Sequence, residues 1–452
     1  MTLPAADRPN AELAIAAAVS GDHAAFIDNA RAAADAMREV VSPTPLQANA
    51  LLSQRYSANI LLKREDLTAV RSYKLRGAYN FFRKALSATS ETTPEHSASA
   101  NGAHPTPRFV CASAGNHAQG FAFACSHFGV DGTIFMPVTT PEQKVAKTRE
   151  FGGDRITIEL EGDIFDQCYQ AAIARAADTG AILVPPFDHP DVIEGQASVA
   201  LEVLAQAPSP IDVLVLPVGG GGLSAGMAPV LAAHSPETKI ILVEPAGAPS
   251  LRQSLREGRR VRLDAVNTFV DGAAVAEIGA LNFEMLRTYD PNEMVIVDED
   301  HLCGTIIEML NSEGIVLEPA GALALHALNA IPSSTLAGKT VVCVTTGGNF
   351  DFERLPEVKE RALRATGRKK YYILRLPQRP GALRDFLDLL GPGDDIARFE
   401  YLKKSARNFG SILIGIESAD PANFTTLEAR MLDQGFTHRD ITDDELIARF
   451  VV

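Results

Sequence analysis

The sequence lacks the features of several large classes of protein. Its five cysteines are scattered and odd in number, with no C-x-x-C pair, which argues against a disulfide framework. Basic residues form no run, and the formal net charge is −14, so the chain would repel a nucleic-acid backbone. No apolar stretch approaches the roughly 18 residues of a membrane span, and no basic segment precedes an apolar one as in a signal peptide. These absences predict a cytoplasmic protein with no nucleic-acid or membrane partner.

The sequence pattern differs between three regions of the chain. The length also predicts about three domains, at about 150 residues a domain. Residues 1–40 are Ala-rich with charges at helical intervals, which predicts an N-terminal helical extension of one or two helices. Prolines at 43 and 45 end it. Over residues 41–360, apolar segments alternate with Gly-rich turns and helical stretches, an order typical of parallel sheets covered by helices. A helix running into a charged, Gly-containing linker is expected at 360–370.

Eight apolar segments of the middle region predict strands, and eight strands over about 300 residues indicate two sheets rather than one. We therefore expect an α/β catalytic region in which a smaller subdomain, about 75–170, is inserted in a larger one. Residues 87–107 are poor in large apolar side chains and are expected to form an exposed loop. The predicted strands are Asn59–Leu62, Arg108–Cys111, Gly132–Met136, Arg155–Ile158, Ala181–Val184, Val213–Pro217, Ile240–Val243 and Thr340–Val344.

Residues 371–452 show a different order, strand-helix-strand-strand-helix-strand in about 80 residues, which is the ferredoxin-like α+β arrangement. The expected strands are Tyr371–Leu376, Ile396–Leu402, Ser411–Ile416 and His438–Ile441, and the expected helices are Ala382–Leu390 and Pro421–Gln434.

Lys74 lies among aromatic and apolar neighbours at the start of an expected helix, in the segment SYKLRGA at 72–78. Burial and the positive end of a helix would both lower the pKa of this amine. A neutral amine is what a Schiff-base lysine needs. The alternative is an exposed helical lysine, which is what most lysines are.

Three turns follow predicted strands, and the first two also precede expected helices. Ser113–Gly120 and the tetraglycine Gly219–Gly222 can aim backbone N–H groups at an anion, and glycine leaves no Cβ in the way. The alternatives are a capped helix start for the first turn and a flexible linker for the second. The third turn, Thr345–Asn349, offers hydroxyls to a ring nitrogen, or is a simple strand-end turn. Together with one lysine, these turns fit a phosphorylated aromatic cofactor held at sheet edges.

At these residues the chain resembles the threonine dehydratase family, within the second fold type of pyridoxal-phosphate enzymes (tryptophan synthase β-like). The resemblance covers about residues 40–355. It implies the cofactor pyridoxal 5'-phosphate and an enzyme of the threonine ammonia-lyase type. It is carried by Lys63–Leu67 with Ser72–Ala78, by Ser113–Gly120, by Pro185–Pro190 and by Gly219–Leu223.

The resemblance also implies a role for each matching residue. Lys74 carries the cofactor and then moves protons, Asn116 bonds the cofactor's phenolic oxygen, and Thr346 meets its pyridine nitrogen. The implied phosphate-binding backbone is that of Gly219, Gly220, Gly221, Gly222 and Leu223. The implied substrate-binding residues are Ser113, Ala114, Gly115 and His117.

The implied reaction converts L-threonine to 2-oxobutanoate and ammonia, the first step of isoleucine biosynthesis. Lys74 takes the proton from Cα, the cofactor ring spreads the charge left there, and the hydroxyl at Cβ leaves. Racemases resembling this family place a second serine where this chain has Ala114, which has no proton to give. Dehydration is therefore expected in preference to racemisation.

The chain departs from the family's pattern at three places. Gly195–Ser198 ends in Ala-Ser where many relatives have Gly-Thr, and Thr346–Asn349 reads Thr-Gly-Gly-Asn instead of Ser-Gly-Ala-Asn. Some relatives bind a divalent cation near Glu244–Ala248 through a second acid, whose place Ser250 takes here. No metal site is therefore expected.

Leu374–Leu383, with its Pro-Gly turn, resembles the opening of the ACT-like regulatory domain of biosynthetic threonine dehydratases. This resemblance implies isoleucine as a feedback inhibitor, valine as a counter-effector and, by family analogy, a homotetramer. The alternative is a domain for packing or oligomerisation that binds no ligand. Three other functions stay open: a serine-preferring ammonia-lyase or racemase, a catabolic threonine enzyme, and a non-catalytic amino-acid sensor, although a sensor has no need of Lys74.

Overall fold

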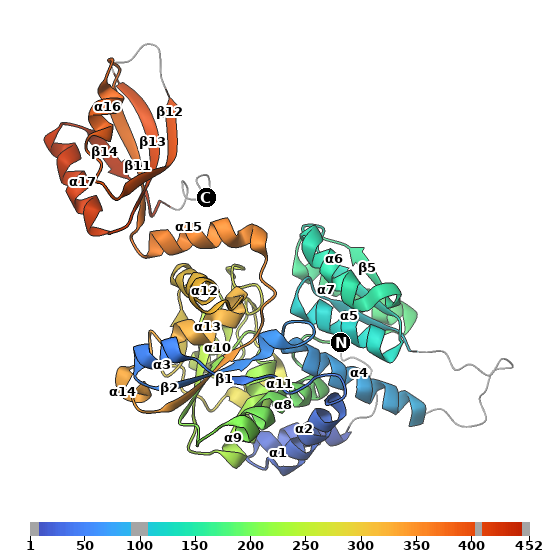
Figure 1. The fold of residues 1–452 in the computed structure, drawn as a ribbon. Helices are drawn as coiled ribbons and strands as arrows, with labels where there is room; N and C mark the ends of the chain where they lie inside the picture. The colour runs from blue at the N-terminus through green and yellow to red at the C-terminus, as the bar shows by residue number, and fades with distance from the viewer. Residues whose placement is uncertain (1–8, 92–106, 403–408, 445–452) are drawn as a thin grey trace. The chain divides into compact units, whose positions relative to one another are not determined.

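The computed structural model describes residues 9–91, 107–402 and 409–444, which group into two compact units (Figure 1). The first unit extends to residue 299 and includes 315–350, and the second contains 300–314 and the residues from 351 onward. A segment from the middle of the chain is thus part of the C-terminal unit.

The larger sheet of the first unit has six strands in the order β1-β2-β10-β7-β8-β9. Its strands are parallel except for the edge strand β1, which pairs antiparallel with β2. The central strands are buried along their whole length, as expected for parallel strands covered on both faces. The strands are β1 (Leu46–Ala48), β2 (Asn59–Arg64), β10 (Thr340–Thr345), β7 (Val213–Pro217), β8 (Lys239–Pro245) and β9 (Val295–Val297).

The smaller sheet is parallel, in the order β5-β4-β3-β6. It confirms the prediction of two sheets. Its strands are β5 (Ile156–Leu160), β4 (Gly132–Met136), β3 (Phe109–Ala112) and β6 (Ile182–Leu183), and its helices are α5 (Asn116–Phe128), α6 (Glu142–Gly152) and α7 (Phe165–Thr179).

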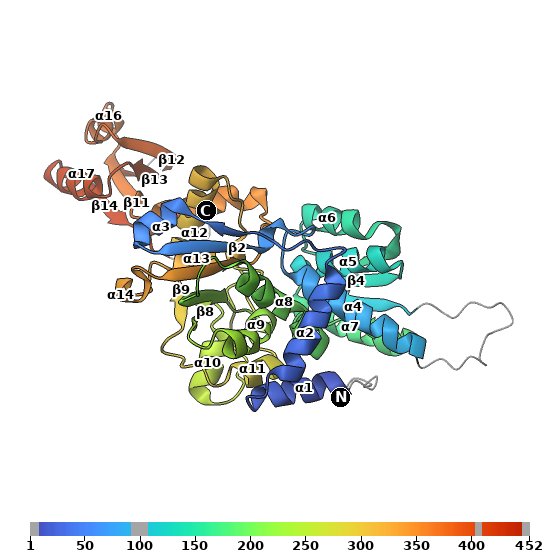
Figure 2. The same cartoon turned by 60° about the horizontal axis from the view of Figure 1, so that its bottom comes forward.

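The predicted N-terminal extension consists of two helices, α1 (Pro9–Val19) and α2 (Ala24–Met37). Apolar residues of both share a core with α8 (Pro190–Gln206) and α9 (Gly222–His234), and Figure 2 shows them beside these helices. The other helices of this unit are α3 (Ala50–Tyr56), η1 (Glu65–Leu67), α4 (Lys74–Glu91), η2 (Gly153–Arg155), α10 (Ser250–Glu257), α11 (Ala280–Leu286), α13 (Pro319–Ala327) and α14 (Ser333–Leu336).

The prediction of a loop at 87–107 is wrong at its start, because helix α4 continues to Glu91. The hydroxyls of Ser87 and Thr89 donate to carbonyl oxygens one turn back, so these polar residues stay within the helix. The rest of that expected loop, 92–106, lies outside the described residues.

The second unit ends in a four-stranded antiparallel sheet in the order β12-β13-β11-β14, with α16 and α17 sharing its apolar core. This confirms the ferredoxin-like order. Helix α16 ends three residues earlier than predicted, ahead of Gly391-Pro392-Gly393, which cannot extend a helix. The elements are β11 (Lys369–Pro377), α16 (Ala382–Leu387), β12 (Asp394–Leu402), β13 (Phe409–Ser418), α17 (Ala422–Asp433) and β14 (Thr437–Asp440).

Two helices complete the second unit, α12 (Glu299–Glu313) and α15 (Leu355–Ala365), which follows η3 (Phe352–Arg354). Arg361 of α15 donates to Asp300 of α12 at 2.7 Å. The expected linker at 360–370 is reduced to three residues, because β11 begins at Lys369, whose amine is buried between Glu360 and Glu417. Within the described ranges, no helix combines the length and apolarity needed to cross a bilayer.

Candidate active site

Lys74 is the first residue of α4, as the sequence predicts. Its Nζ donates a hydrogen bond to the carbonyl oxygen of Pro186 at 2.7 Å, and the centre of the Phe187 ring lies 5.7 Å from Nζ. Burial lowers the pKa of Lys74 to about 8, although the Glu318 carboxylate opposes this effect. A substantial fraction of the amine is therefore neutral near pH 8, which a nucleophilic lysine requires.

The tetraglycine turn joins β7 to α9, and its fourth glycine is the first residue of that helix. A Cβ on Gly220 would lie 2.2 Å from the Phe187 ring, and one on Gly219 would lie 2.8 Å from the Cα of Ala273. Gly221 has a φ of +90°, a left-handed conformation that favours glycine. The N–H groups of the following first turn, which includes Leu223, have no acceptor within the helix. The turn therefore forms an anion cradle beside the segment that binds Lys74.

The turn between β3 and α5 has the predicted strand-turn-helix form, with Gly115 as the N-cap of α5. Ser113 Oγ accepts a hydrogen bond from the N–H of Gly115 at 3.2 Å, and Ala114 lies between them. His117 is buried, and its Nε2 lies 3.1 Å from the carbonyl oxygen of Val184. Burial, and secondly the charge of Lys74, lower the pKa of His117 to about 3, so its imidazole is neutral.

Glu318 is a residue of this site that sequence reasoning missed. Its Oε1 accepts a hydrogen bond from Asn116 Nδ2 at 2.6 Å, and Asn116 Oδ1 accepts one from Asn349 Nδ2 at 2.6 Å. Lys147 in turn donates to Asn349. Burial and the nearby Asp271 raise the pKa of Glu318 to about 7. The available signal was the position of this acid, between the apolar Ile315–Leu317 and the proline that begins α13.

The turn after β10 contacts the two residues that precede Lys74. The carbonyl oxygen of Thr346 accepts a hydrogen bond from the N–H of Tyr73 at 3.2 Å, and Ser72 forms a β-bridge with Gly347. Thr345, by contrast, donates to Asp66 Oδ1 at 2.7 Å and so serves the structure of the turn. The three predicted turns and the lysine are therefore brought together in one unit, each at the carboxyl end of a strand or the start of a helix.

Glu244, near which some relatives of this family were expected to bind a cation, caps α10. Its two oxygens accept the N–H groups of Leu251 and Arg252 at 2.7 and 2.9 Å. Burial raises the pKa of Glu244 to about 8. No group of three or more His, Cys, Asp or Glu residues suited to a metal ion is found within the described ranges.

Two family models match this chain. Residues 37–347 match the family described as pyridoxal-phosphate dependent enzymes, and residues 360–451 match the C-terminal regulatory domain of threonine dehydratase.

Curated relatives are similar over nearly their whole length. The "L-threonine dehydratase biosynthetic IlvA" of Bacillus subtilis is 46% identical over 410 residues, which are 90% of this chain and 93% of that protein. Its namesake in Halalkalibacterium halodurans is 40% identical over 417 residues, 92% of this chain and 96% of that protein. Among solved structures, the processed form of threonine deaminase isoform 2 from Solanum lycopersicum matches with a TM-score of 0.65 and 35% identity, covering 75% of this chain and 87% of that one.

The residues of the site fit the cofactor of this family. A lysine with a lowered pKa suits its aldehyde, four glycines that leave the main chain bare suit its phosphate, and the Asn116 amide suits a ring oxygen. The chain belongs to the threonine dehydratase family of pyridoxal-phosphate-dependent enzymes, in its biosynthetic form with a C-terminal regulatory domain.

Proposed function

We propose that this chain converts L-threonine to 2-oxobutanoate and ammonia, with pyridoxal 5'-phosphate held by Lys74. The observation that carries the proposal is the Lys74 amine, which has a pKa of about 8 and lies at the start of α4. The tetraglycine turn borders the same Pro186–Phe187 segment that this amine contacts. Names of the curated relatives, matched over nearly their full lengths, agree with this reaction.

Each part of the site has a task in this reaction. The cradle of Gly219–Leu223 would bind the cofactor phosphate, Asn116 its phenolic oxygen and Thr346 its ring nitrogen. Ser113–Gly115 would bind the substrate carboxylate. His117 stays neutral at physiological pH because of its pKa of about 3, so it adds no charge there.

Proton transfer falls to Lys74. When bound, the cofactor supplies a sink for the electron pair left at Cα. The neutral Nζ of Lys74 accepts the Cα proton, and as an ammonium it can give a proton to the hydroxyl that leaves Cβ as water. Hydrolysis then consumes one water and releases ammonia and the 2-oxo acid. Ala114 offers no proton to the opposite face of Cα, which favours elimination over racemisation.

The test is the purified protein with threonine, followed for 2-oxo acid, beside a Lys74→Ala variant. We expect the variant to lose the yellow colour of the lysine-bound cofactor and at least ~10³-fold of the activity. Lys359→Ala, an exposed lysine of α15, is the matched control and should behave as wild type. Unchanged colour and ammonia release in Lys74→Ala would show the proposal to be wrong. The same assay with serine as substrate distinguishes a serine-preferring ammonia-lyase from an enzyme that prefers threonine.

The proposal extends to regulation and assembly. We propose that the C-terminal unit binds isoleucine as an inhibitor and valine as a counter-effector, that four chains assemble, and that the enzyme acts in the cytoplasm. Residues 360–451, which match the regulatory domain, support the first part. All five cysteines are buried and lie outside disulfides, which suits a reducing compartment. Light scattering tests the assembly.

A further inference from the structure

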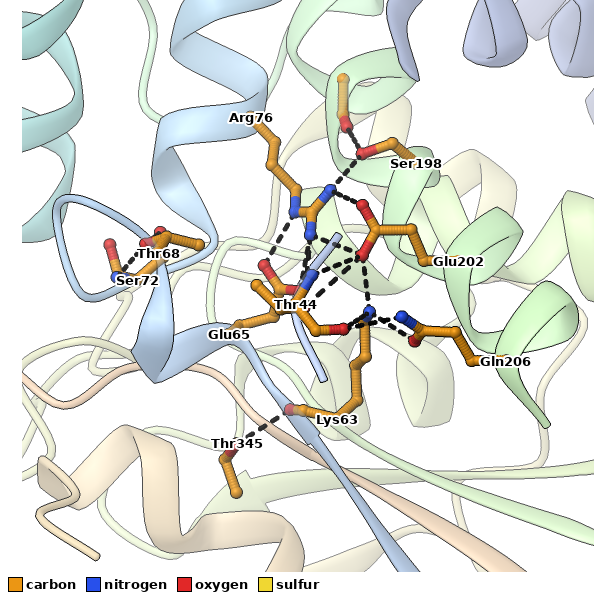
Figure 3. Close-up of polar contacts among 11 residues, drawn as sticks. Thr44, Lys63, Glu65, Thr68, Ser72, Arg76, Ser198, Glu202, Gln206 and Thr345 are labelled. Atoms are coloured by element: carbon orange, nitrogen blue, oxygen red, sulfur yellow. Dashed lines mark hydrogen bonds and ion pairs between the residues drawn. The ribbon is translucent and has the colours of Figure 1, made fainter. Parts of the chain in front are cut away.

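A buried ionic cluster lies next to the first turn of α4 and has no part in the proposed reaction (Figure 3). We define it as Lys63 of β2, Glu65 of η1, Arg76 of α4 and Glu202 of α8. Arg76 is only 1% exposed and stands two residues after Lys74. Figure 3 shows its guanidinium between the two carboxylates.

The guanidinium of Arg76 is held at two edges. Nε and Nη2 donate to Glu65 at 2.7 and 2.8 Å, and Nη1 and Nη2 donate to Glu202 at 2.6 and 2.9 Å. Ser198 Oγ accepts a further bond from Nη1 at 3.1 Å. Two such bidentate pairs fix the plane of the guanidinium as well as its position.

Lys63 balances the charge of the cluster. Its Nζ donates to the carbonyl oxygen of Thr44 at 2.7 Å, to Glu202 Oε2 at 2.5 Å and to Gln206 Oε1 at 3.0 Å. Burial lowers the pKa of Lys63, and the carboxylates of Glu65 and Glu202 oppose this. Three acceptors around one nitrogen each require a proton, so the amine is charged, and two cations offset two carboxylates. Because burying such ions is unfavourable, stability alone is a poor reason for the cluster.

The backbone of the same turn is tightly enclosed. A Cβ on Gly195 of α8 would lie 2.6 Å from the carbonyl oxygen of Arg76, and one on Gly120 of α5 would lie 3.2 Å from that of Lys74. The turn is therefore packed between α5 and α8. Successive residues of a helix differ by about 100°, so Lys74 and Arg76 leave α4 on roughly opposite sides. The cluster therefore holds the face of the first turn of α4 that lies opposite to Lys74 Nζ.

We propose that Arg76 is a positioning residue for Lys74. By joining Glu65 next to β2 to Glu202 of α8, it sets the rotation and depth of the first turn of α4. Lys74 Nζ is thereby kept at the Pro186 carbonyl, beside the tetraglycine turn. The inference rests on the proposed function, because it takes Lys74 as the cofactor lysine.

Arg76→Lys tests the proposal, because lysine keeps the charge but cannot make two bidentate pairs. A displacement of about 1 Å can lower a rate about 100-fold. We therefore expect kcat for threonine to fall about 100-fold with KM nearly unchanged, and affinity for pyridoxal phosphate to fall at least about 10-fold. The pH midpoint at which the lysine-bound cofactor changes its absorbance should shift. Arg83→Lys is the matched control, since Arg83 lies on the same helix and its guanidinium donates to Asn80 of that helix.

Glu202→Gln is the second variant, in case Arg76→Lys does not fold. It keeps the shape of the side chain and should reproduce the cofactor effects in weaker form. The thermal midpoint of the cofactor-free protein separates positioning from stability. A lower midpoint with unchanged cofactor affinity, spectrum and kcat in the folded variants would overturn the proposal. If wild type binds the cofactor through Lys74 but forms no 2-oxo acid, the proposed function fails, while the binding and spectral comparisons still decide the role of Arg76.

Discussion

At the scale of single residues, burial shifts the pKa of three ionisable groups of the site. It lowers the pKa of Lys74 to about 8 and that of His117 to about 3, and it raises the pKa of Glu318 to about 7. All three shifts favour the neutral form, as expected where little water surrounds the groups. The site is therefore suited to moving a proton near neutral pH without carrying a large fixed charge.

Glu318→Gln should change how stability depends on pH. With a raised pKa, folded Glu318 keeps a proton that the unfolded chain releases, so its contribution is present at low pH and lost as pH rises through about 7. Asp271 adds to the shift, and Asn116, Lys144 and Lys147 oppose it. We expect the thermal midpoint of the cofactor-free protein to fall between about pH 5 and pH 8 more in wild type than in the variant. Over this pH range, the free energy of unfolding should fall in wild type by at most about 3 kcal/mol more than in the variant.

Glutamine matches the size of Glu318 and still offers Asn116 an oxygen, so packing is preserved. Glu244, whose pKa burial raises to about 8, titrates in both proteins and leaves their difference unaffected. Parallel curves of thermal midpoint against pH for wild type and Glu318→Gln would contradict the prediction.

Lys74 and the turns could be predicted from sequence, because each combines an unusual residue type with a neighbouring strand or helix. Glu318 and Glu202 could not, because their partners Asn116 and Arg76 are 202 and 126 residues away along the chain. A buried carboxylate looks like any surface acid until the fold brings its partner to it.

At the scale of elements, the parallel strands are predictable because they are buried apolar runs that end at glycine turns, as β7 does before the tetraglycine. Helix ends are harder. The extension of α4 to Glu91 depends on Ser and Thr hydroxyls bonding to the previous turn, and nothing in composition distinguishes that from a loop.

Gly220→Ala tests the tetraglycine turn as an element. The added Cβ would lie 2.2 Å from the Phe187 ring, and the displaced ring would disturb the Pro186 carbonyl that binds Lys74. We expect affinity for pyridoxal phosphate to fall at least about 10-fold, by analogy with 1 Å displacements in other sites, with a lower kcat. Fluorescence titration of the cofactor-free protein measures the affinity.

Gly304→Ala is the matched control, because nothing lies within 4 Å of a Cβ at this position of α12. Its backbone φ is not positive, so alanine should be neutral or stabilise the helix by about 0.5–1 kcal/mol. Equal cofactor affinity in the two variants would remove the argument for close packing at Gly220.

At the scale of the whole molecule, residues 300–314 form a compact unit with the C-terminal part of the chain, which no sequence pattern indicates. The predicted boundary near residue 360 followed composition, whereas α15 continues to Ala365 and bonds to α12 through Arg361 and Asp300. Domain limits depend on which helices pack together, and that is decided by contacts far apart in the sequence.

Two truncated chains test which residues are needed for catalysis and which are needed for regulation. A chain that stops after Gly367 keeps α15, so Asp300 stays paired and Cys303 of α12 stays near the charged residues of α15. We expect it to form 2-oxo acid from threonine at a rate similar to that of the full chain, but without inhibition by isoleucine. A chain that stops after Phe350 loses α15 and unpairs Asp300, so it should be less stable by about 1–3 kcal/mol and prone to aggregate. Inhibition by isoleucine in the longer truncated chain would place the effector site outside residues 368–452. Equal stability of the two truncated chains would show that α15 belongs to regulation alone.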